Sequence, residues 1–230
     1  MSADRHNVAA LIPCYFEERH IRDVAARTKA QLDTVLVVDD GSTDRTTDEA
    51  RETGAEVIRH ERNQGKGGAI KTGLRELTSR DGIEWILILD GDGQHLPEEI
   101  PHFLSAANDQ QASMIVGNRM SDTRKMPLVR KLTNLTMSGL ISAIIGQRVP
   151  DSQCGFRMFR KDLAAAFVDM PSSNFDFESE MLAIAARRGL KIAAARISTV
   201  YGDERSKIHP FRDTVRFFQL LGRLRQERKA

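Results

Sequence analysis

The sequence has 230 residues, of which 40% are hydrophobic and 29% are charged, as in an ordinary soluble globular protein. This length suits one sizeable domain or at most two small ones. The sequence has no apolar run near the roughly 20 residues that cross a bilayer and no basic-then-apolar leader at its start. Its two cysteines, Cys14 and Cys154, are too few for a disulfide scaffold and wrongly spaced for a metal clip, so we expect a cytoplasmic protein.

The net charge of +2 conceals an uneven distribution. Residues 201–230 contain eight Lys or Arg and four Asp or Glu, so this segment carries +4 and residues 1–200 carry −2. The basic segment indicates an anionic partner. Its last part, 209–230, has apolar residues at helical spacing among arginines. This pattern predicts an amphipathic helix that either packs on the domain or lies on an anionic membrane surface.

Short apolar segments and helical segments alternate through the first half of the chain. The apolar runs predict buried strands at residues 8–13, 34–40, 55–60, 85–90 and 114–119. Helices are predicted between them, at about 19–32, 43–53, 68–77 and 97–107. Runs that are continuously apolar are typical of strands covered on both faces, as in a parallel sheet. We therefore expect an α/β fold with a mostly parallel open sheet and helices on both faces.

The alternation fades after residue 119. Residues 126–146 form a long apolar stretch, which predicts a helix that either fills the core or faces lipid. Strands are predicted within 154–160 and 191–200, and a helix over 175–189 that ends at a glycine. Because the sequence contains no internal repeat or linker, we expect one catalytic domain over 1–208. The helix at 209–230 either belongs to it or contacts a membrane.

Carboxylates gather where two of the predicted strands end. Ligands bind beyond the carboxyl ends of strands in open α/β sheets, so Asp39 and Asp40 should share an edge with Asp90 and Asp92. In "WILILDGDGQH", alternation along an extended chain places Asp90, Asp92 and Gln94 on one side. Three oxygen ligands suit a hard cation such as Mg²⁺ or Mn²⁺. A solvated turn is the better explanation of any single Asp-Gly pair, but the whole pattern favours a metal site.

Two other interpretations of this segment make specific demands on the sequence. A calcium-binding EF-hand loop that starts at Asp90 needs Gly at its sixth position and Glu at its twelfth, but His95 and Pro101 stand there. A phosphatase or phosphotransferase with Asp90 as nucleophile also places an Asp-x-Asp after an apolar strand. It expects Thr or Val where Gln94 stands. The calcium loop is excluded, and the phosphatase remains an alternative.

The other two polar segments are ambiguous by themselves. Asp39 or Asp40 could accept hydrogen bonds from a nucleobase or ribose, or could simply belong to a turn that caps a helix. The glycine-rich segment 62–73 lacks the spacing of a Walker A loop, which ends in Gly-Lys-Ser or Gly-Lys-Thr. Its Lys66 and backbone N–H groups could still hold a phosphate, although a structural turn is equally consistent with the sequence.

Taken together, the segments "IPCYFEE", "VVDDGSTDRT", "NQGKGGAIKTG", "LDGDGQH", "GNR" and "CGFRMFR" resemble the inverting family 2 glycosyltransferases of the glycosyltransferase A fold. More narrowly, they resemble the polyprenyl-phosphate glycosyltransferases of the dolichyl-phosphate mannose synthase type, over about residues 8–209. The resemblance implies metal-dependent inverting transfer of a hexose from a GDP- or UDP-sugar to a polyprenyl phosphate. The site of action would be the inner, cytoplasmic face of a membrane, with no nucleic-acid partner.

The resemblance also implies a role for individual residues. Those that would contact the nucleotide are Pro13, Tyr15, Glu17, Asp39, Asp40, Lys66 and Asp90, together with Arg205, Ser206 and Lys207 from a mobile loop. The Mg²⁺ or Mn²⁺ ligands would be Asp90, Asp92 and Gln94. The residues expected at the acceptor and the reaction centre are Arg119, Arg130, Asp151 and Arg157.

The need for a general base depends on the acceptor. A phosphate acceptor is already ionised near neutral pH and needs no strong base. A hydroxyl acceptor requires one, and Asp151, Asp176 and Glu178 are the candidates. Transfer to a hydroxyl therefore stays open beside the phosphatase and a catalytically silent nucleotide-sugar binder. The donor's base and sugar, the oligomeric state and a role for His95 are not predicted.

Overall fold

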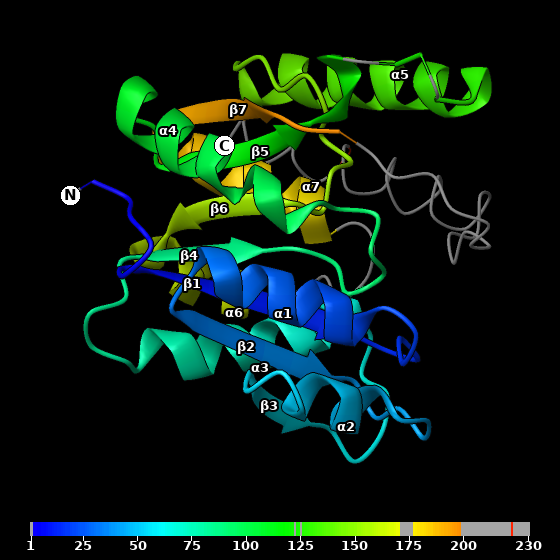
Figure 1. Ribbon diagram of the computed structural model, residues 1–230. Coiled ribbons are helices and arrows are strands. Elements are labelled where there is room, and N and C mark those ends of the chain that lie inside the picture. The colour runs from blue at the N-terminus through cyan, green and yellow to red at the C-terminus, as the bar shows by residue number, and fades with distance from the viewer. Residues whose placement is uncertain (1, 122, 125, 171–176, 199–221, 223–230) are drawn as a thin grey trace.

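The computed structural model describes residues 2–121, 123–124, 126–170, 177–198 and 222 (Figure 1). Within them, a seven-stranded sheet has the order β3-β2-β1-β4-β6-β5-β7. Its strands are β1 (Val8–Cys14), β2 (Thr34–Asp39), β3 (Glu56–Arg59), β4 (Trp85–Ile88), β5 (Met114–Asn118), β6 (Arg157–Arg160) and β7 (Ile192–Arg196). β6 is antiparallel to β4 and β5, and the other neighbouring pairs are parallel. Apart from residue 222, the helix predicted over 209–230 lies outside the described residues.

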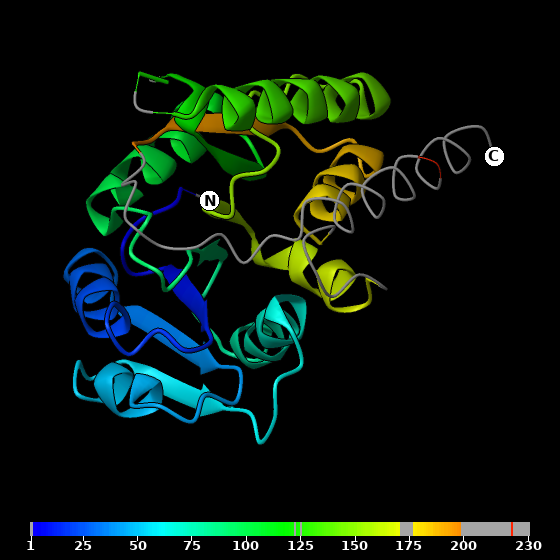
Figure 2. The ribbon, with the colours of Figure 1, turned by 90° about the vertical axis from the view of Figure 1, so that its right-hand side faces the viewer.

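Helices cover both faces of this sheet, as Figure 2 shows. On one side lie α1, α2 and α4, and on the other lie α3, α6 and α7, while α5 runs along the end of the sheet at β7. The helices are α1 (Ile21–Gln31), α2 (Thr46–Arg51), α3 (Lys66–Thr78), α4 (Ile100–Gln110), α5 (Leu128–Ile145), α6 (Ala164–Val168) and α7 (Phe177–Arg187). Short 3-10 turns occupy Pro97–Glu99, Arg119–Ser121 and Lys161–Leu163.

The register of the central strands brings their C-terminal ends together. All seven residues of β1 are buried. β1 pairs in parallel with β2 up to Cys14 opposite Asp39, and with β4 up to Leu11 opposite Ile88. The pairing continues one residue beyond β4, where the Leu89 N–H donates to the Leu11 carbonyl at 3.2 Å. The loops after β1, β2 and β4 therefore leave the sheet at the same edge, where an open α/β fold binds its ligands.

The predicted mostly parallel α/β sheet with helices on both faces is confirmed. Two features were not predicted: the antiparallel direction of β6 and the short helix α6. The helix predicted from residue 43 begins only at Thr46, because the preceding residues form a turn. The Asp44 carboxylate helps to close that turn by accepting the Thr46 N–H at 3.1 Å.

The long apolar helix predicted over 126–146 is present as α5, which ends at Gly146 with a φ of 73°. This left-handed conformation favours glycine and ends the helix where expected. None of the helices among the described residues combines the length and the apolarity needed to cross a bilayer. The position of α5 is nevertheless unusual, because much of its apolar surface faces outward.

Candidate active site

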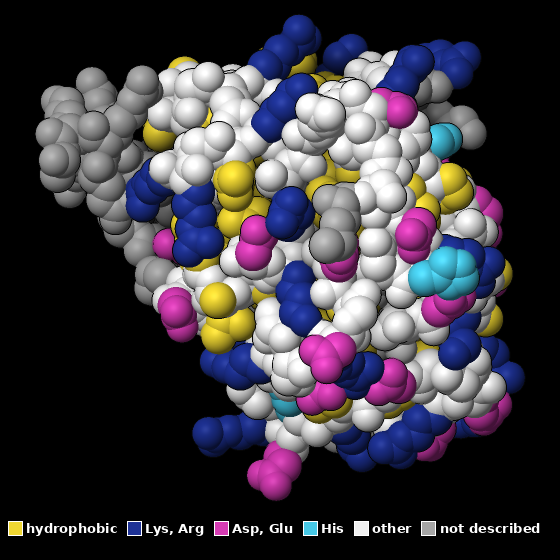
Figure 3. Space-filling view, turned by 90° about the vertical axis from the view of Figure 1, so that its left-hand side faces the viewer, with side chains coloured by type: hydrophobic (Ala, Val, Ile, Leu, Met, Phe, Trp, Pro, Cys, Tyr) yellow, Lys and Arg dark blue, Asp and Glu magenta, His cyan; other side chains and the backbone are white. Residues whose placement is uncertain are grey.

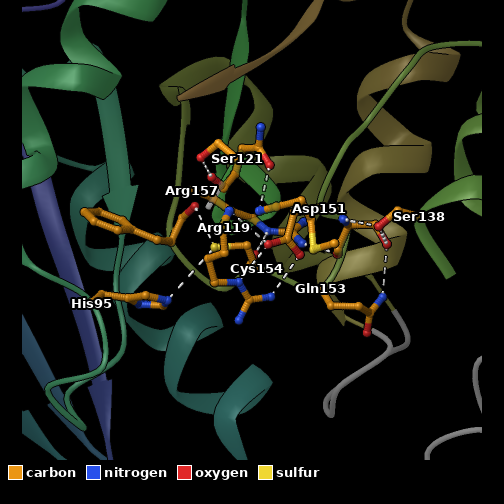
Figure 4. Close-up of polar contacts among 12 residues, drawn as sticks. His95, Arg119, Ser121, Ser138, Asp151, Gln153, Cys154 and Arg157 are labelled. Carbon is orange, nitrogen blue, oxygen red and sulfur yellow. Dashed lines mark hydrogen bonds and ion pairs between the residues drawn. The ribbon is translucent and has the colours of Figure 1, made fainter. Parts of the chain in front are cut away.

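The edge formed by the ends of β1, β2 and β4 holds most of the predicted site residues. Those at this edge are Pro13, Tyr15, Glu17, Asp39, Asp40, Lys66, Asp90, Asp92 and Gln94. A second group, Arg119, Asp151 and Arg157, lies at the ends of β5 and β6 (Figure 4). The sheet thus presents a carboxylate-rich group from its parallel half beside an arginine-rich group from its mixed half.

An exposed aromatic pair follows β1. Tyr15 and Phe16 keep 36% and 46% of their surfaces exposed, and their rings lie edge to face with centroids 4.5 Å apart. The φ of Phe16 is 56°, a strained conformation for a bulky residue. It is held by the Phe16 N–H, which donates to the Ser42 hydroxyl at 2.9 Å. Exposed rings can stack on a nucleobase, and the sequence analysis identified Tyr15 but missed Phe16.

Asp39 is fully buried at the end of β2. Its Oδ1 accepts the Ser42 N–H at 3.0 Å, and its Oδ2 accepts the Thr47 hydroxyl. Both oxygens therefore fix the turn between β2 and α2. The neighbouring Glu17 is also buried, and its N–H donates to the Thr46 hydroxyl at 2.9 Å. These contacts tie the loops after β1 and β2 into one rigid wall of the edge.

Asp40 holds the glycine-rich segment in place. Its Oδ1 accepts the Gln64 N–H at 2.9 Å and lies 2.7 Å from His60 Nδ1, while its Oδ2 accepts the Gly65 N–H at 2.8 Å. Gly41 completes the contact, because a Cβ there would lie 2.8 Å from the carbonyl carbon of Arg62. In this structure, Asp40 anchors the loop that leads into Lys66.

Lys66 begins α3 and bridges two carboxylates. Its Nζ lies 2.8 Å from Asp90 Oδ1 and 2.8 Å from Glu178 Oε1. Desolvation opposes the charge of the lysine, but the charges of Asp90 and Glu178 outweigh it and raise the pKa of Lys66 above its usual range. A fixed ammonium at this edge is suited to a diphosphate. The sequence analysis considered Glu178 only as a base and missed its pairing with Lys66 across the sheet.

Asp90, Asp92 and Gln94 form the predicted oxygen-ligand segment after β4. Desolvation would raise the pKa of Asp90, but the charge of Lys66 outweighs it, so the pKa is lowered and the group is ionised at neutral pH. Asp92 Oδ1 accepts the Gln94 N–H at 3.0 Å, which turns the loop. Gly155 keeps one side of Asp90 open, because a Cβ there would lie only 2.8 Å from Asp90 Oδ2.

This donor set fits a hard divalent cation. The described residues contain no cluster of three or more His, Cys, Asp or Glu side chains placed to enclose a metal ion. Two carboxylates and an amide would leave positions for other oxygens, which is how Mg²⁺ is usually held together with substrate phosphates. The sequence analysis missed Gly155, since nothing in "CGFRMFR" shows which side chain the glycine approaches.

His95 directly follows the predicted oxygen-ligand segment in the chain. It is 4% exposed, its ring packs on Phe156 with centroids 5.2 Å apart, and its Nε2 lies 4.0 Å from Cys154 Sγ (Figure 4). Its Nδ1 is buried without a hydrogen-bond partner. Burial is the main cause that lowers the pKa of His95 to about 4, although Asp90 opposes the shift. The imidazole is therefore neutral and belongs to the packing beneath the site.

Arg119 and Asp151 form a two-pronged ion pair at the second group. Arg119 Nε donates to Asp151 Oδ2 at 2.7 Å, and Nη2 donates to Oδ1 at 2.9 Å (Figure 4). The Arg119 N–H adds a third contact to Oδ2 at 3.2 Å. Asp151 is fully buried, whereas the Arg119 side chain remains 15% exposed. The carboxylate thus orients the guanidinium, and its own proton-accepting capacity is already engaged.

Arg157, for which a place at the reaction centre was predicted, is buried and bonded to the backbone. It is 1% exposed and donates to backbone carbonyls of Cys154 and Ser152 at 2.7 Å each, and to that of Glu178. Burial lowers its pKa from the usual range, opposed by Glu178. In this structure the guanidinium joins the loop before β6 to the start of α7. This function needs an arginine because one fork must satisfy several carbonyls.

The remaining predicted residues lie elsewhere. Arg130 is half-buried on α5, between Arg119 and Asp151 in the chain. Asp176 and the loop residues Arg205, Ser206 and Lys207 lie outside the described residues, so their predicted roles stay predictions.

Comparison with known proteins decides the family. Residues 9–167 match the profile described as Glycosyl transferase family 2. The chain belongs to glycosyl transferase family 2. Its relatives in this family include the UDP-N-acetylglucosamine–dolichyl-phosphate N-acetylglucosaminyltransferase of Methanococcus voltae, 31% identical over 83% of this chain and 84% of that protein. They also include the undecaprenyl-phosphate mannosyltransferase of Micrococcus luteus, 31% identical over 84% and 83% of the two chains.

The family 2 assignment agrees with the fold. The crystal structure of glucosyl-3-phosphoglycerate synthase from Mycobacterium tuberculosis in complex with UDP superimposes with a TM-score of 0.75 at 19% identity, covering 96% of this chain and 80% of that one. The glycosyltransferase A fold, the resemblance to polyprenyl-phosphate glycosyltransferases and the prediction of a glycosyltransferase are thereby confirmed. The family assignment takes the place of the alternative interpretation, a phosphatase with Asp90 as nucleophile.

Proposed function

We propose that this family 2 glycosyltransferase moves a hexose from a UDP- or GDP-sugar to a polyprenyl phosphate, with inversion and with a divalent cation. Two relatives that align over more than four fifths of both chains are named for polyprenyl-phosphate acceptors. Glucosyl-3-phosphoglycerate synthase from Mycobacterium tuberculosis was crystallised with Mn²⁺, UDP and phosphoglyceric acid. That structure superimposes on this one with a TM-score of 0.67 at 17% identity. These comparisons support the acceptor and the cation, and the geometry supplies the chemical reasons.

The proposal rests on one observation: both candidate general bases that the structure describes, Asp151 and Glu178, are paired with cations. Asp151 is fully buried and held by Arg119, and Glu178 is paired with Lys66. A hydroxyl acceptor needs a carboxylate that can take its proton, whereas a phosphate acceptor arrives already ionised. The pairing of both carboxylates with cations therefore favours a phosphate acceptor over a hydroxyl.

The reaction follows from this assignment. A phosphate oxygen of the acceptor forms a bond to the anomeric carbon from the face opposite the diphosphate. The bond between that carbon and the diphosphate oxygen breaks, and the nucleoside diphosphate leaves with the electron pair. Negative charge grows on the leaving group, so positive groups that meet it there lower the barrier.

The residues of the carboxylate-rich edge suit the donor. Tyr15 and Phe16 provide an aromatic surface for the base, between the walls fixed by Asp39 and Asp40. Asp90, Asp92 and Gln94 would hold Mg²⁺ or Mn²⁺, which supplies positive charge to the diphosphate when bound. Lys66 stands beside Asp90 and adds a second positive charge. We propose that Arg205, Ser206 and Lys207 close over the same diphosphate.

The second group suits the acceptor. Asp151 orients the Arg119 guanidinium, and we propose that Arg119 and Arg130 receive the acceptor phosphate. Arg157 contributes indirectly, by fixing the loop that carries Asp151 and Ser152. It is a positioning residue in this account.

A transfer assay with a donor panel tests the proposal. The purified protein is incubated with Mn²⁺, with GDP-mannose, UDP-glucose or UDP-N-acetylglucosamine, and with a short polyprenyl phosphate or the matching polyprenol. We expect one donor to give a glycosylated polyprenyl phosphate and the polyprenol to give none. A product formed only with the polyprenol would contradict the phosphate acceptor. Asp92→Ala serves as the inactive control.

A further inference from the structure

Helix α5 exposes large apolar side chains in its first half, whereas Met137, Ile144 and Ile145 of its second half pack against the core. Its buried positions are Asn134, Ser138 and Ile141, of which two are polar. Its large apolar side chains face solvent instead, with 82% of Leu128, 80% of Val129, 68% of Leu132 and 49% of Leu135 exposed. A helix that only packed on its domain would show the opposite arrangement. The outer face of α5 therefore needs an explanation other than the core.

The exposed leucines form a continuous surface. Leu128, Leu132 and Leu135 are separated by four and three residues, so they lie along one side of the helix, and Val129 borders them. We call these four residues the α5 stripe. Single exposed apolar residues are common on soluble proteins, but a contiguous exposed patch marks a site of interaction.

The charges within the segment that carries the α5 stripe are all positive. Residues 123–150 contain five Lys or Arg and no Asp or Glu. At α1, by contrast, positive and negative side chains are balanced, because Arg22 pairs with Glu49 and Arg27 pairs with Glu98. Figure 3 shows the lower part of one face, where basic and acidic side chains are interspersed in the ordinary way. The segment around α5 is thus built to meet negative charge.

The buried face of α5 is connected to the candidate active site. The Ser138 hydroxyl accepts the Ser152 N–H at 2.8 Å, directly after Asp151 (Figure 4). Arg119 lies in the short turn that precedes α5 in the chain, and its side chain bonds to the same Asp151. A surface that held the outer face of α5 would therefore lie about 10 Å, one helix diameter, from the loop that carries Asp151.

We propose that α5 docks on an anionic membrane surface, with the α5 stripe inserted at the lipid interface and the surrounding cations on the headgroups. This inference rests on the proposed function, because a polyprenyl phosphate is held in a membrane. Charge disfavours the other occupants. A second copy would place the same positive segment against itself, and residues 201–230 of this chain are also basic, with a net +4.

Vesicle flotation tests the proposal with the full chain. Vesicles of phosphatidylcholine alone are compared with vesicles that contain about 30% phosphatidylglycerol, at low and high salt. We expect binding to the anionic vesicles that weakens at high salt. Leu128→Ser combined with Leu132→Ser should reduce this binding by roughly tenfold or more. The matched control Leu140→Ser, at a leucine of the same helix with 37% exposure, should change it by less than about twofold.

A variant that gains a fluorescence signal on binding tests the proposal without relying on a loss of vesicle binding. The one natural tryptophan, Trp85, is buried in β4 and 4% exposed. In Leu128→Trp, a new emission should shift to shorter wavelength on anionic vesicles only. A control, Arg75→Gln on the exposed side of α3, should bind as the wild type does. No shift in Leu128→Trp, together with unchanged flotation of the double variant, would overturn the proposal.

The other occupants give distinct results. A dimer in sedimentation velocity that the double variant converts to a monomer would replace the membrane with a second copy. If the double variant melts at a lower temperature but binds vesicles as the wild type does, the α5 stripe is covered by residues of the same chain instead of a membrane. Transfer to a short soluble prenyl phosphate separates the two proposals: the double variant should retain it. If the wild type binds vesicles through α5 but glycosylates no polyprenyl phosphate, the proposed function fails and the docking stands.

Discussion

The parallel half of the sheet and the half around β5, β6 and α5 use their polar residues in opposite ways. In the first, Asp39 and Asp40 are satisfied by N–H and hydroxyl groups of their own loops. In the second, a buried Asp151 orients a partly exposed Arg119, and α5 turns leucines outward. The loops of the first half are fixed by their own hydrogen bonds, and the second half presents a partly exposed cation and apolar surface at its outside. The difference matches a small donor on one side and a lipid acceptor on the other.

Asp92→Ala should have the largest effect on this comparison. Loss of one metal ligand removes charge stabilisation from the leaving diphosphate, so we expect kcat to fall by about 10³-fold, equivalent to about 4 kcal/mol. The bond that the Asp92 carboxylate accepts from the Gln94 N–H lies within one loop, so we expect the melting temperature to stay within a few degrees of the wild-type value. Turnover near the wild-type value would contradict the metal assignment.

His95→Leu tests the buried packing beneath the donor half. The pKa of His95 is about 4 in the folded protein against 6.5 for the free side chain, mainly because of burial. The unfolded chain therefore takes up a proton as pH falls from 6.5 to 4, and the folded protein loses about 3 kcal/mol of stability over that window. Urea unfolding at several pH values should show this loss reduced in His95→Leu. The exposed His102→Gln is the control, and an equal slope in both variants would refute the assignment.

Arg119→Lys tests the acceptor half. Lysine keeps the charge but cannot make the two-pronged contact with Asp151, so the cation is less well placed for the acceptor phosphate. We expect KM for the polyprenyl phosphate to rise by roughly tenfold, with KM for the nucleotide sugar almost unchanged. An equal rise in both constants would mean that Arg119 serves the donor.

Gly155→Ala should have a smaller and more local effect. Its Cβ would lie 2.8 Å from Asp90 Oδ2 and 3.1 Å from Lys66 Nζ, so one of them must move. We expect Mn²⁺ affinity in the presence of UDP to fall by about tenfold in calorimetry, or about 1.4 kcal/mol. The control Gly139→Ala, on exposed α5 with open space around it, should leave the affinity unchanged and stabilise the helix by about 0.5–1 kcal/mol.

The two halves also differ in how well the sequence predicts them. The parallel strands are predicted because each is a continuous apolar run, and Asp39 and Asp90 fall at one edge because parallel strands end together. The direction of β6 was not predicted, since a short apolar run carries no sign of direction. Contacts between distant segments were also missed. Lys66 meets Glu178, and Gly155 meets Asp90, only because β6 and α7 fold back onto the donor edge.

Helix α5 shows the limit most clearly. Its apolar sequence predicts a helix but not the direction in which that helix faces, because leucine is common both in cores and on lipid-facing surfaces. The positions of Asn134 and Ser138 on the buried side decide the question, and Ser152, the partner of Ser138, lies in the loop after the helix. Arg157 is a second example. The resemblance implied a place at the reaction centre, and the structure shows the guanidinium donating to three backbone carbonyls, a contact that the sequence did not predict.

One measurement tests the central claim most directly: the initial rate of sugar transfer to a polyprenyl phosphate and to the matching polyprenol, with the same donor and Mn²⁺. If the acceptor is an ionised phosphate that needs no protein base, the phosphate should react and the alcohol should give no detectable product. The rate with the phosphate should disappear when a chelator removes the cation. Transfer to the alcohol at an equal or higher rate, or full activity in the chelator, would contradict the account.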